Sequence, residues 1–498
     1  MNIFKSSWLF LSFLMIISCS NDDDSGATDN DNPVVIDNPN QDVQEFIWQG
    51  MNNIYLYKND VANLADDRFA TFDELYTFLN TFDNPEDLFD GLLSSQDRFS
   101  FLVDDYIALE NSFSGISQTT GMDFNLILVS EGSDEVLGFV RYILPGTDAE
   151  SKGITRGQFF SSIDGEQLNT SSDFNELFSR SSYEVGFVTI ENGVITPDEN
   201  VTLTQSEYTE NPVLLAKTID HDGQKIGYLM YNAFTGTFDQ ELNEAFANFN
   251  AEGVTELVLD LRYNGGGSVT SAVRLASMIT GQFEGEVFSK EIWNDEYQAF
   301  FLSEEGGNGE SLVNRFVSEI TQFDENGNQT GAIPINSLNL TNLYVLTTDR
   351  TASASELIIN GLDPYINVIQ IGEITTGKFQ ASVTLYDADG FSRTGDNLDT
   401  SHTYAIQPLV LVSANKNDVG NFIDGLVPDV SLSENPLDLG TLGEVDEPFL
   451  EAALDYISNG TVLGRKSPGL PYQTIGESKM FSPTYQRMYI DDFNQRSK

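Results

Sequence analysis

The stretch "DRTASASELIING" (349–361) places three hydroxyl residues between two apolar segments. The preceding "LYVLTT" (343–348) predicts a buried strand, and the apolar residues that follow recur at helical spacing. Ser353, followed three residues later by Glu356, matches a capping box, which satisfies free N–H groups at the start of a helix. The alternative is that this serine is a nucleophile presented at a strand-to-helix junction, beside those N–H groups.

A second unusual stretch is "LVLDLRYNGGGSV" (257–269), in which an apolar strand ends with Asn264 and three glycines. Glycines allow backbone N–H groups to approach a ligand closely and to point at an anion. A sharp strand-to-helix turn without a ligand is the alternative. The run lacks the Gly-Lys-Ser/Thr of a phosphate loop and does not match the dinucleotide-binding fingerprint.

The third stretch is "EITTGKFQASVTLYD" (373–387), in which Lys378 follows another predicted buried strand. The chain has 24 basic residues against 77 acidic ones, and its only histidines are His221 and His402. A general base for Ser353 is therefore more readily supplied by lysine. Such a base must be neutral, so its pKa must fall from the usual value of about 10.4 through desolvation. A surface lysine in a hairpin is the alternative.

These stretches lie in a region, 207–440, where apolar strands alternate with helices. Near-continuous Val, Ile and Leu strands separated by helices indicate a largely parallel sheet that is covered on both faces. Functional groups in such folds lie beyond the carboxyl ends of the strands, where the glycine run and the serine-rich stretch are found. The expected strands are 225–234, 256–263, 342–348 and 367–374, and the expected helices are 238–253, 267–281 and 354–365.

The flanking regions differ in character. Residues 43–112 have apolar residues at spacings of three and four, which predicts a small helical cap. Residues 282–341 are irregular, with many glycines and acids. Residues 441–498 are expected to form a helix, 446–457, followed by a partly ordered tail from 459 onward.

Residues 113–206 predict short strands with Gly/Pro turns, and "PGTDAESKGITRGQ" is similar to a stretch of bacterial PDZ domains. A module of this kind binds an extended peptide by adding it as a strand to a sheet edge. The peptide-binding turn would be "GMDF" (121–124), with Gly121, Met122 and Phe124 as the contacting residues. Asp123 places an acid where a peptide carboxylate would dock. A β-rich insertion without a ligand is the alternative.

The order of the helical cap, the PDZ-like module, "LVLDLRYNGGG", "TASASE" and "GK" resembles the C-terminal-processing serine proteases of peptidase family S41, over residues 43–458. The resemblance implies an α/β fold with a crotonase/ClpP-like parallel-sheet core. It implies that Ser353 is the nucleophile, that Lys378 is its base, and that the N–H groups of Gly266 and Ala354 stabilise the oxyanion. Ser382 stands where the family often has a glutamine that supports the lysine.

Two rival functions share this fold. One is a non-catalytic peptide-binding scaffold, against which the presence of both Ser353 and Lys378 argues. The other is a crotonase-type acyl-CoA enzyme, in which a PDZ-like module would have no role. The net charge of −53 argues against nucleic acid as a partner, because phosphate binding requires clustered Lys and Arg. The expected partners are polypeptide substrates. No cluster has metal-ligand spacing, so we expect neither a metal nor another cofactor.

The first residues predict a targeting signal. Lys5 precedes a short apolar run that is too short to span a bilayer, which is typical of a secretory signal peptide. "IISC" (16–19) resembles the lipobox of bacterial lipoproteins, in which the cysteine is lipidated. We therefore expect a signal peptide over 1–19, an acidic tether over 20–42 that is similar to surface-export signals of Bacteroidetes, and a membrane-anchored lipoprotein of the outer membrane. An ordinary signal peptide is the alternative.

Replacing Cys19 with alanine should release the protein from membranes into the soluble fraction, because lipidation would supply the anchor. The measurement is the distribution of the protein between membrane pellet and supernatant after a high-salt wash. A Cys19→Ala variant that stays in the pellet would contradict the lipid anchor.

Overall fold

The computed structural model describes residues 39–128, 132–304, 306–323, 328–462, 472–491 and 493. The predicted signal peptide, Cys19 and nearly all of the predicted tether lie outside these residues. From Asn40 onward the chain forms one compact unit. Within the described ranges, no helix has both the length and the apolar character needed to cross a bilayer.

A six-stranded sheet forms the core, and it is parallel except at one edge. Its order is β10 (Val213–His221), β11 (Gln224–Tyr231), β12 (Glu256–Asp260), β18 (Asn342–Thr347), β19 (Asn367–Gly372) and β24 (Val430–Ser431). Only the pair of β10 and β11 is antiparallel. The four predicted strands are therefore present in one sheet, as expected from their continuous apolar sequences.

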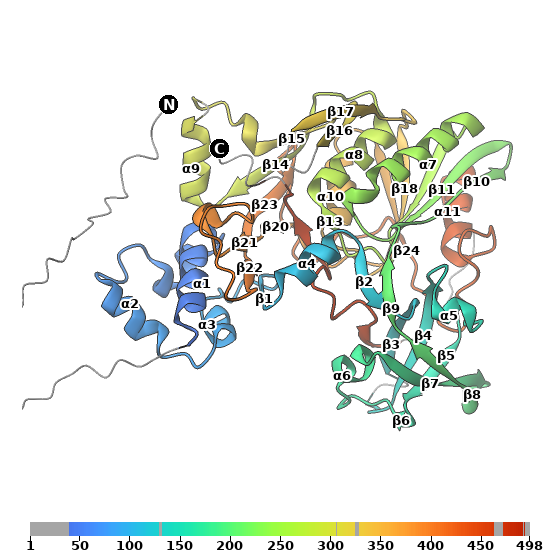
Figure 1. The fold of residues 1–498 in the computed structure, drawn as a ribbon. Helices are drawn as coiled ribbons and strands as arrows, with labels where there is room; N and C mark the ends of the chain where they lie inside the picture. Colours follow the sequence, from blue (N-terminus) through green and yellow to red (C-terminus); the bar gives the residue numbers. More distant parts are fainter. Residues whose placement is uncertain are drawn as a thin grey trace, which may run out of the picture. The chain divides into compact units, whose positions relative to one another are not determined.

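Helices cover both faces of this sheet (Figure 1). The helices α7 (Asp239–Glu252), α8 (Val269–Thr280) and α10 (Ala354–Leu362) pack on one face, and α11 (Pro448–Asn459) packs on the other. Side chains of β12 alternate between the two: Leu257 and Leu259 join the first core, whereas Val258 joins the second. This alternation follows from the period of two in a strand. It confirms the prediction of a sheet that is buried on both sides.

A second six-stranded sheet lies beside the first. Its order is β13 (Gly267–Ser268), β26 (Met488–Tyr489), β20 (Gln380–Ser382), β23 (Leu409–Asn415), β14 (Val287–Trp293) and β15 (Val313–Arg315). The prediction that 282–341 is irregular is wrong, since this region also contains α9 (Asp295–Glu304) and a hairpin of β16 (Glu319–Phe323) and β17 (Gln329–Pro334). β14 also pairs with the distant β23, whereas β16 and β17 form a local hairpin that the prediction missed.

The N-terminal region is mainly helical, as expected, with α1 (Gln41–Ile54), α2 (Phe72–Leu79), α3 (Pro85–Gly91) and α4 (Tyr106–Phe113). A short strand, β1 (Phe101–Val103), departs from the prediction. It pairs with β22 (Ala405–Gln407), which also pairs with β21 (Leu385–Tyr386). This pairing joins the helical region directly to the segment that follows Lys378.

The β-rich module contains one mainly antiparallel sheet with two short helices, α5 (Asp148–Ser151) and α6 (Phe174–Ser179). The sheet order is β25 (Thr474–Glu477), β3 (Met122–Leu128), β4 (Val136–Ile143), β5 (Phe159–Ile163), β7 (Ser182–Glu191) and β8 (Val194–Thr204), with β6 (Glu166–Gln167) paired to β5. Two further strands, β2 (Ile116–Thr119) and β9 (Ser206–Thr209), pair with each other at the ends of the module.

The segment expected to be a partly ordered tail contains two strands within the described residues 472–491. This segment supplies β25 to the module and β26 to the second sheet. Both strands are very short and pair with residues far away in the sequence. No local sequence pattern therefore predicts them.

Candidate active site

The three unusual sequence stretches lie beyond the carboxyl ends of three neighbouring parallel strands, β12, β18 and β19. Two of the three hydroxyl residues in the serine-rich stretch hold the glycine segment in place. Thr351 Oγ1 donates to the Leu261 carbonyl at 2.9 Å, and Ser355 Oγ donates to the Asn264 carbonyl at 3.1 Å. The hydroxyl of the third residue, Ser353, does not bind the glycine segment.

Ser353 is 1% exposed, and among the described residues its Oγ has no hydrogen-bond partner. Its backbone adopts φ 67° and ψ −116°, a strained conformation for a residue with a side chain. Its N–H donates to Glu356 Oε2 at 2.7 Å, which is one half of the predicted capping box. The Glu356 N–H also faces the Ser353 side chain, so the predicted capping box is present, but the serine hydroxyl forms no regular hydrogen bond.

Glu356 connects the serine to the lysine segment. Its buried carboxylate also accepts hydrogen bonds from the N–H of Gly377 at 2.7 Å, the N–H of Lys378 at 2.9 Å and Thr375 Oγ1 at 2.6 Å. Burial raises the pKa of Glu356, and the donors, Thr375 first, counteract this rise. One side chain thus fixes the backbone on both sides of the site.

Lys378 is 0% exposed, and its Nζ has no hydrogen-bond partner in the part of the chain that the structure describes. The Nζ lies 5.0 Å from the centre of the Phe99 ring, which the N-terminal region supplies. Burial holds the pKa of Lys378 well below its ordinary value of 10.5, and the nearby Arg487 lowers it further. The amine is therefore in the environment that a neutral general base requires.

The glycine run packs directly against the serine. Gly266 has φ 108°, and a Cβ built on it would lie 2.6 Å from Ser353 Cβ and 3.0 Å from the Ala354 nitrogen. Only glycine fits there. In this structure, however, the Gly266 N–H donates to Asn264 Oδ1 at 2.8 Å. The expected oxyanion donor is therefore engaged within its own loop, whereas Ala354, the other expected donor, is the first residue of α10.

Two other expected contacts are not formed here. The Ser382 hydroxyl donates to Gln407 Oε1 at 2.6 Å and to the Met488 carbonyl, and does not bind Lys378. Ser353 and Lys378 are not hydrogen-bonded to each other, since both groups are without a partner among the described residues. Neither Gln407 nor Phe99 could be predicted as part of the site, because each reaches it from a distant segment.

The histidines lie elsewhere. His402 Nε2 is 3.1 Å from Asp387 Oδ2, and His221 Nε2 is 3.7 Å from Asp222 Oδ2. Neither forms a hydrogen bond with Ser353 or Lys378. Asp387, His402 and Asp399 offer atoms within 4.8 Å of one another, a grouping that the sequence spacing did not indicate. The expectation that the protein holds no metal therefore stays a prediction.

A cleft of about 620 Å³ lies between the glycine run of the site and the β-rich module, and neither Ser353 nor Lys378 is among its lining residues. It is lined by Gly265, Gly266 and Gly267 on one side, by Gly121 and Met122 on another, and by residues 477–479 and 481–486. The predicted turn therefore reaches the same cleft as the glycine run. Phe124 does not line it and packs against Phe178 of α6, with ring centres 4.6 Å apart.

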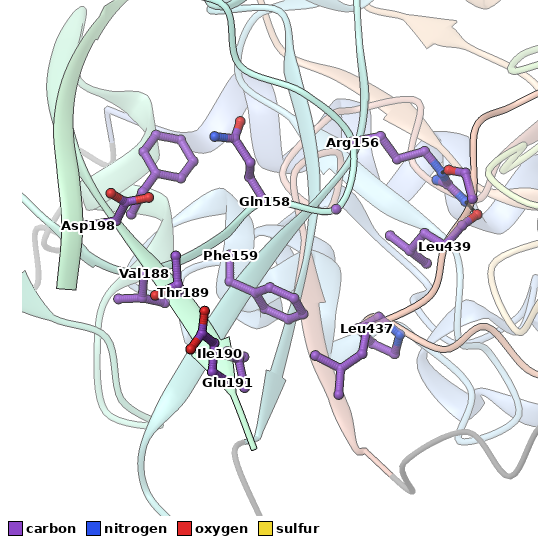
Figure 2. Close-up of a pocket in the computed structure, with 14 residues that line it drawn as sticks. Arg156, Gln158, Phe159, Val188, Thr189, Ile190, Glu191, Asp198, Leu437 and Leu439 are labelled. Atoms are coloured by element: carbon purple, nitrogen blue, oxygen red, sulfur yellow. Dashed lines mark hydrogen bonds between the residues drawn. The ribbon is translucent and has the colours of Figure 1, made fainter. Parts of the chain in front are cut away.

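Figure 2 shows a separate pocket of about 440 Å³ between β5, β7 and residues 436–440. Phe159, Val188 and Leu439 line it, and Arg156 extends along its edge. None of the predicted site residues contributes to this pocket.

Comparison with known proteins agrees with the geometry. Residues 225–408 match the model of peptidase family S41, and residues 42–101 match the model of the peptidase S41 N-terminal domain. Residues 225–408 are therefore similar to the peptidase S41 domain. The first match includes the glycine run, Ser353 and Lys378, and the second covers most of the predicted helical cap, including Phe99.

Curated S41 relatives are distant in sequence. The chain is 24% identical over 334 residues to a carboxyl-terminal-processing protease of Synechocystis sp., and the match covers 66% of each chain. It is 23% identical over 367 residues to a protease of the same name from Picosynechococcus sp., covering 73% of this chain and 75% of the relative.

A solved structure shows the same fold. A Bacteroides fragilis protein assigned to the S41 proteases aligns with a TM-score of 0.61 at 24% identity, covering 84% of this chain and 97% of that one. The expected α/β peptidase fold is therefore confirmed.

Replacing Glu356 with glutamine should reduce kcat by tenfold or more. Glutamine offers one acceptor oxygen in place of two, and each buried donor left without a partner costs about 1–3 kcal/mol. The measurement is steady-state cleavage of an unfolded protein, with thermal unfolding as a check of the fold. Glu252→Gln, which changes an exposed acid on α7, is the matched control. Equal kcat in the two variants would contradict a role for Glu356 in holding the site.

Proposed function

We propose that the protein is a serine endopeptidase in which Ser353 is the nucleophile and Lys378 is the general base. One observation carries the proposal: two buried reactive groups without hydrogen-bond partners, Ser353 Oγ and Lys378 Nζ, whose backbones are bound to the same carboxylate. Burying polar groups without partners is costly, and such groups are retained where chemistry needs them.

In the proposed mechanism the neutral Lys378 amine takes the proton of Ser353 as its Oγ attacks a peptide carbonyl. The N–H of Ala354 stabilises the developing oxyanion, joined by the N–H of Gly266 after the loop releases it from Asn264. Lys378 then returns the proton to the leaving amine. Water, deprotonated by the same lysine, hydrolyses the acyl-enzyme and frees Ser353.

The proposed substrates are unfolded or C-terminally exposed polypeptides. The names of the two curated relatives support this class, as does a cleft that lies between the glycine run and a β-rich, PDZ-like module. We also propose that the protein is secreted and held in the cell envelope as an outer-membrane lipoprotein through Cys19. The N-terminal sequence alone supports that part of the proposal.

A second candidate is a non-catalytic peptide-binding scaffold. It is favoured by the hydrogen bond from Gly266 to Asn264 and by the absence of a hydrogen bond between Ser353 and Lys378 in this structure. Reaction with a serine-directed fluorophosphonate distinguishes the two functions. A catalytic serine is labelled at position 353, whereas a scaffold stays unlabelled.

Replacing Ser353 with alanine should reduce peptide hydrolysis by roughly 10⁴-fold or more, because no other group can form the acyl-enzyme. The fold should be retained, since the lost hydroxyl has no hydrogen-bond partner. Cleavage of an unfolded protein by purified wild type and variant is the measurement. A variant that cleaves at the wild-type rate would show that another residue is the nucleophile.

The rate should rise with pH through a single ionisation, that of Lys378. Below the pKa of Lys378 the amine is charged and cannot accept a proton, so activity is lost as the pH falls. Because burial lowers this pKa, the rise should lie well below pH 10.5. Lys378→Arg should be as inactive as Lys378→Ala, since arginine keeps its proton.

The pH–rate profile also tests the histidines. The variants His221→Gln and His402→Gln should keep the wild-type profile. Appreciable activity in Lys378→Arg, or loss of the ionisation in either histidine variant, would show that lysine is not the base.

A further inference from the structure

Residues 472–490, the C-terminal segment, run from the β-rich module to the active site. Its first strand, β25, lies antiparallel to β3 at the outer edge of the module sheet. The pairing continues beyond the strand, where Ser478 N–H donates to the Phe124 carbonyl at 3.0 Å. This edge of β3, whose first residues belong to the predicted peptide-binding stretch 121–124, is where strand addition would place an extended peptide ligand.

Buried charges hold this part of the segment. Glu477 is 4% exposed and its Oε2 lies 2.6 Å from Arg141 Nη1. Arg350 approaches the other oxygen at 3.6 Å. Ser478 Oγ donates to Asp123 Oδ2 at 2.8 Å, so the acid in the predicted binding turn receives a hydroxyl of the chain itself.

The second strand, β26, lies between two strands of the active site. Met488 pairs with Gly267 of β13, and Tyr489 pairs with Ser382 of β20. In Figure 1 the red C-terminal strand runs between the elements that contain the glycine run and the lysine segment. Ile490 N–H donates to the Ser382 carbonyl at 3.1 Å, which extends the pairing.

The backbone of Arg487 lies close to Ser353, the proposed nucleophile. The point that a Cβ of Gly266 would occupy is 2.5 Å from the Arg487 carbonyl oxygen, 2.6 Å from Ser353 Cβ and 3.0 Å from the Ala354 nitrogen. The Arg487 guanidinium donates to the Phe99 carbonyl at 2.5 Å. This hydrogen bond links the C-terminal segment to the N-terminal region. A peptide carbonyl of this chain therefore lies against Gly266, on the side of the glycine run that faces Ser353.

We propose that the outer edge of β3 and the cleft beside the glycine run form one channel for an extended polypeptide, and that the C-terminal segment is its resident occupant, which a substrate must displace. This inference rests on the proposed function. The segment uses the two strand edges that a substrate strand needs. While it is bound, the Gly266 N–H is turned to Asn264, so the segment is held without being cut.

The C-terminal segment and a substrate would compete for the same channel, which lowers the apparent affinity for the substrate. A substrate binds only the fraction of molecules in which the segment is released, so its apparent affinity falls by that fraction. Weakening the docking of the segment should therefore strengthen the binding of a peptide in trans. Breaking a buried ion pair is the most direct way to weaken docking.

The test is a binding measurement in full-length protein that carries Ser353→Ala, so that it does not depend on catalysis. The probe is a fluorescent peptide with the sequence of residues 472–490, followed by anisotropy. Glu477→Lys places a cation beside Arg141 and Arg350, and it should tighten binding of the probe by about tenfold or more. Glu166→Lys, an equal charge change at an exposed position of the module, should bind as weakly as the parent.

Hydrogen exchange at residues 125–128 reports the docking of β25 directly and should accelerate in Glu477→Lys alone. Ser478→Ala, which removes the hydroxyl bound to Asp123, is the milder second variant and should change both readouts in the same direction. Unchanged exchange in the Glu477 and Ser478 variants, or faster exchange without tighter binding of the probe, would overturn the proposal. Failure of the fluorophosphonate reaction at Ser353 would instead overturn the proposed function and leave these binding results intact.

Discussion

The arrangement of the site depends on one buried carboxylate, that of Glu356. It accepts hydrogen bonds from backbone groups on both sides of the site and from Thr375. A carboxylate can accept several hydrogen bonds at once because it has two oxygens and no proton to donate. The turn after β18 and the turn after β19 are therefore held in a fixed relation, which Thr376 N–H strengthens by donating to the Thr351 carbonyl at 3.0 Å.

Burial makes a lysine suitable as a base in a protein with a net charge of −53. An acidic surface favours protonated amines, but exposed charges more than about 10 Å away are largely screened at 0.1 M salt. Desolvation acts at the amine itself and is the largest influence on Lys378. Phe99 is part of this burial, so the N-terminal region contributes to the lowered pKa of Lys378 although it supplies neither of the proposed reacting groups.

The parts of this fold that could be predicted are those with a local signal. The strands around β12, β18 and β19 are continuous apolar runs, and Ser353 and Lys378 follow two of them directly. Phe99, Gln407 and the C-terminal strands could not be predicted, because their roles depend on pairing with residues far away in the sequence. The orientation of the Gly266 N–H could not be predicted either. It donates to the side chain of Asn264, only two residues away, and the sequence does not reveal the conformation of this loop.

The place of β26 between β13 and β20 has a consequence for biosynthesis. Residues 488–489 follow every other strand of both sheets in the sequence, yet they lie between two of the strands that surround Ser353. Until they are made, the facing edges of β13 and β20 have no partner strand within the chain. A chain that is still being synthesised thus passes through a stage in which these edges are open, and pairing with β26 closes them.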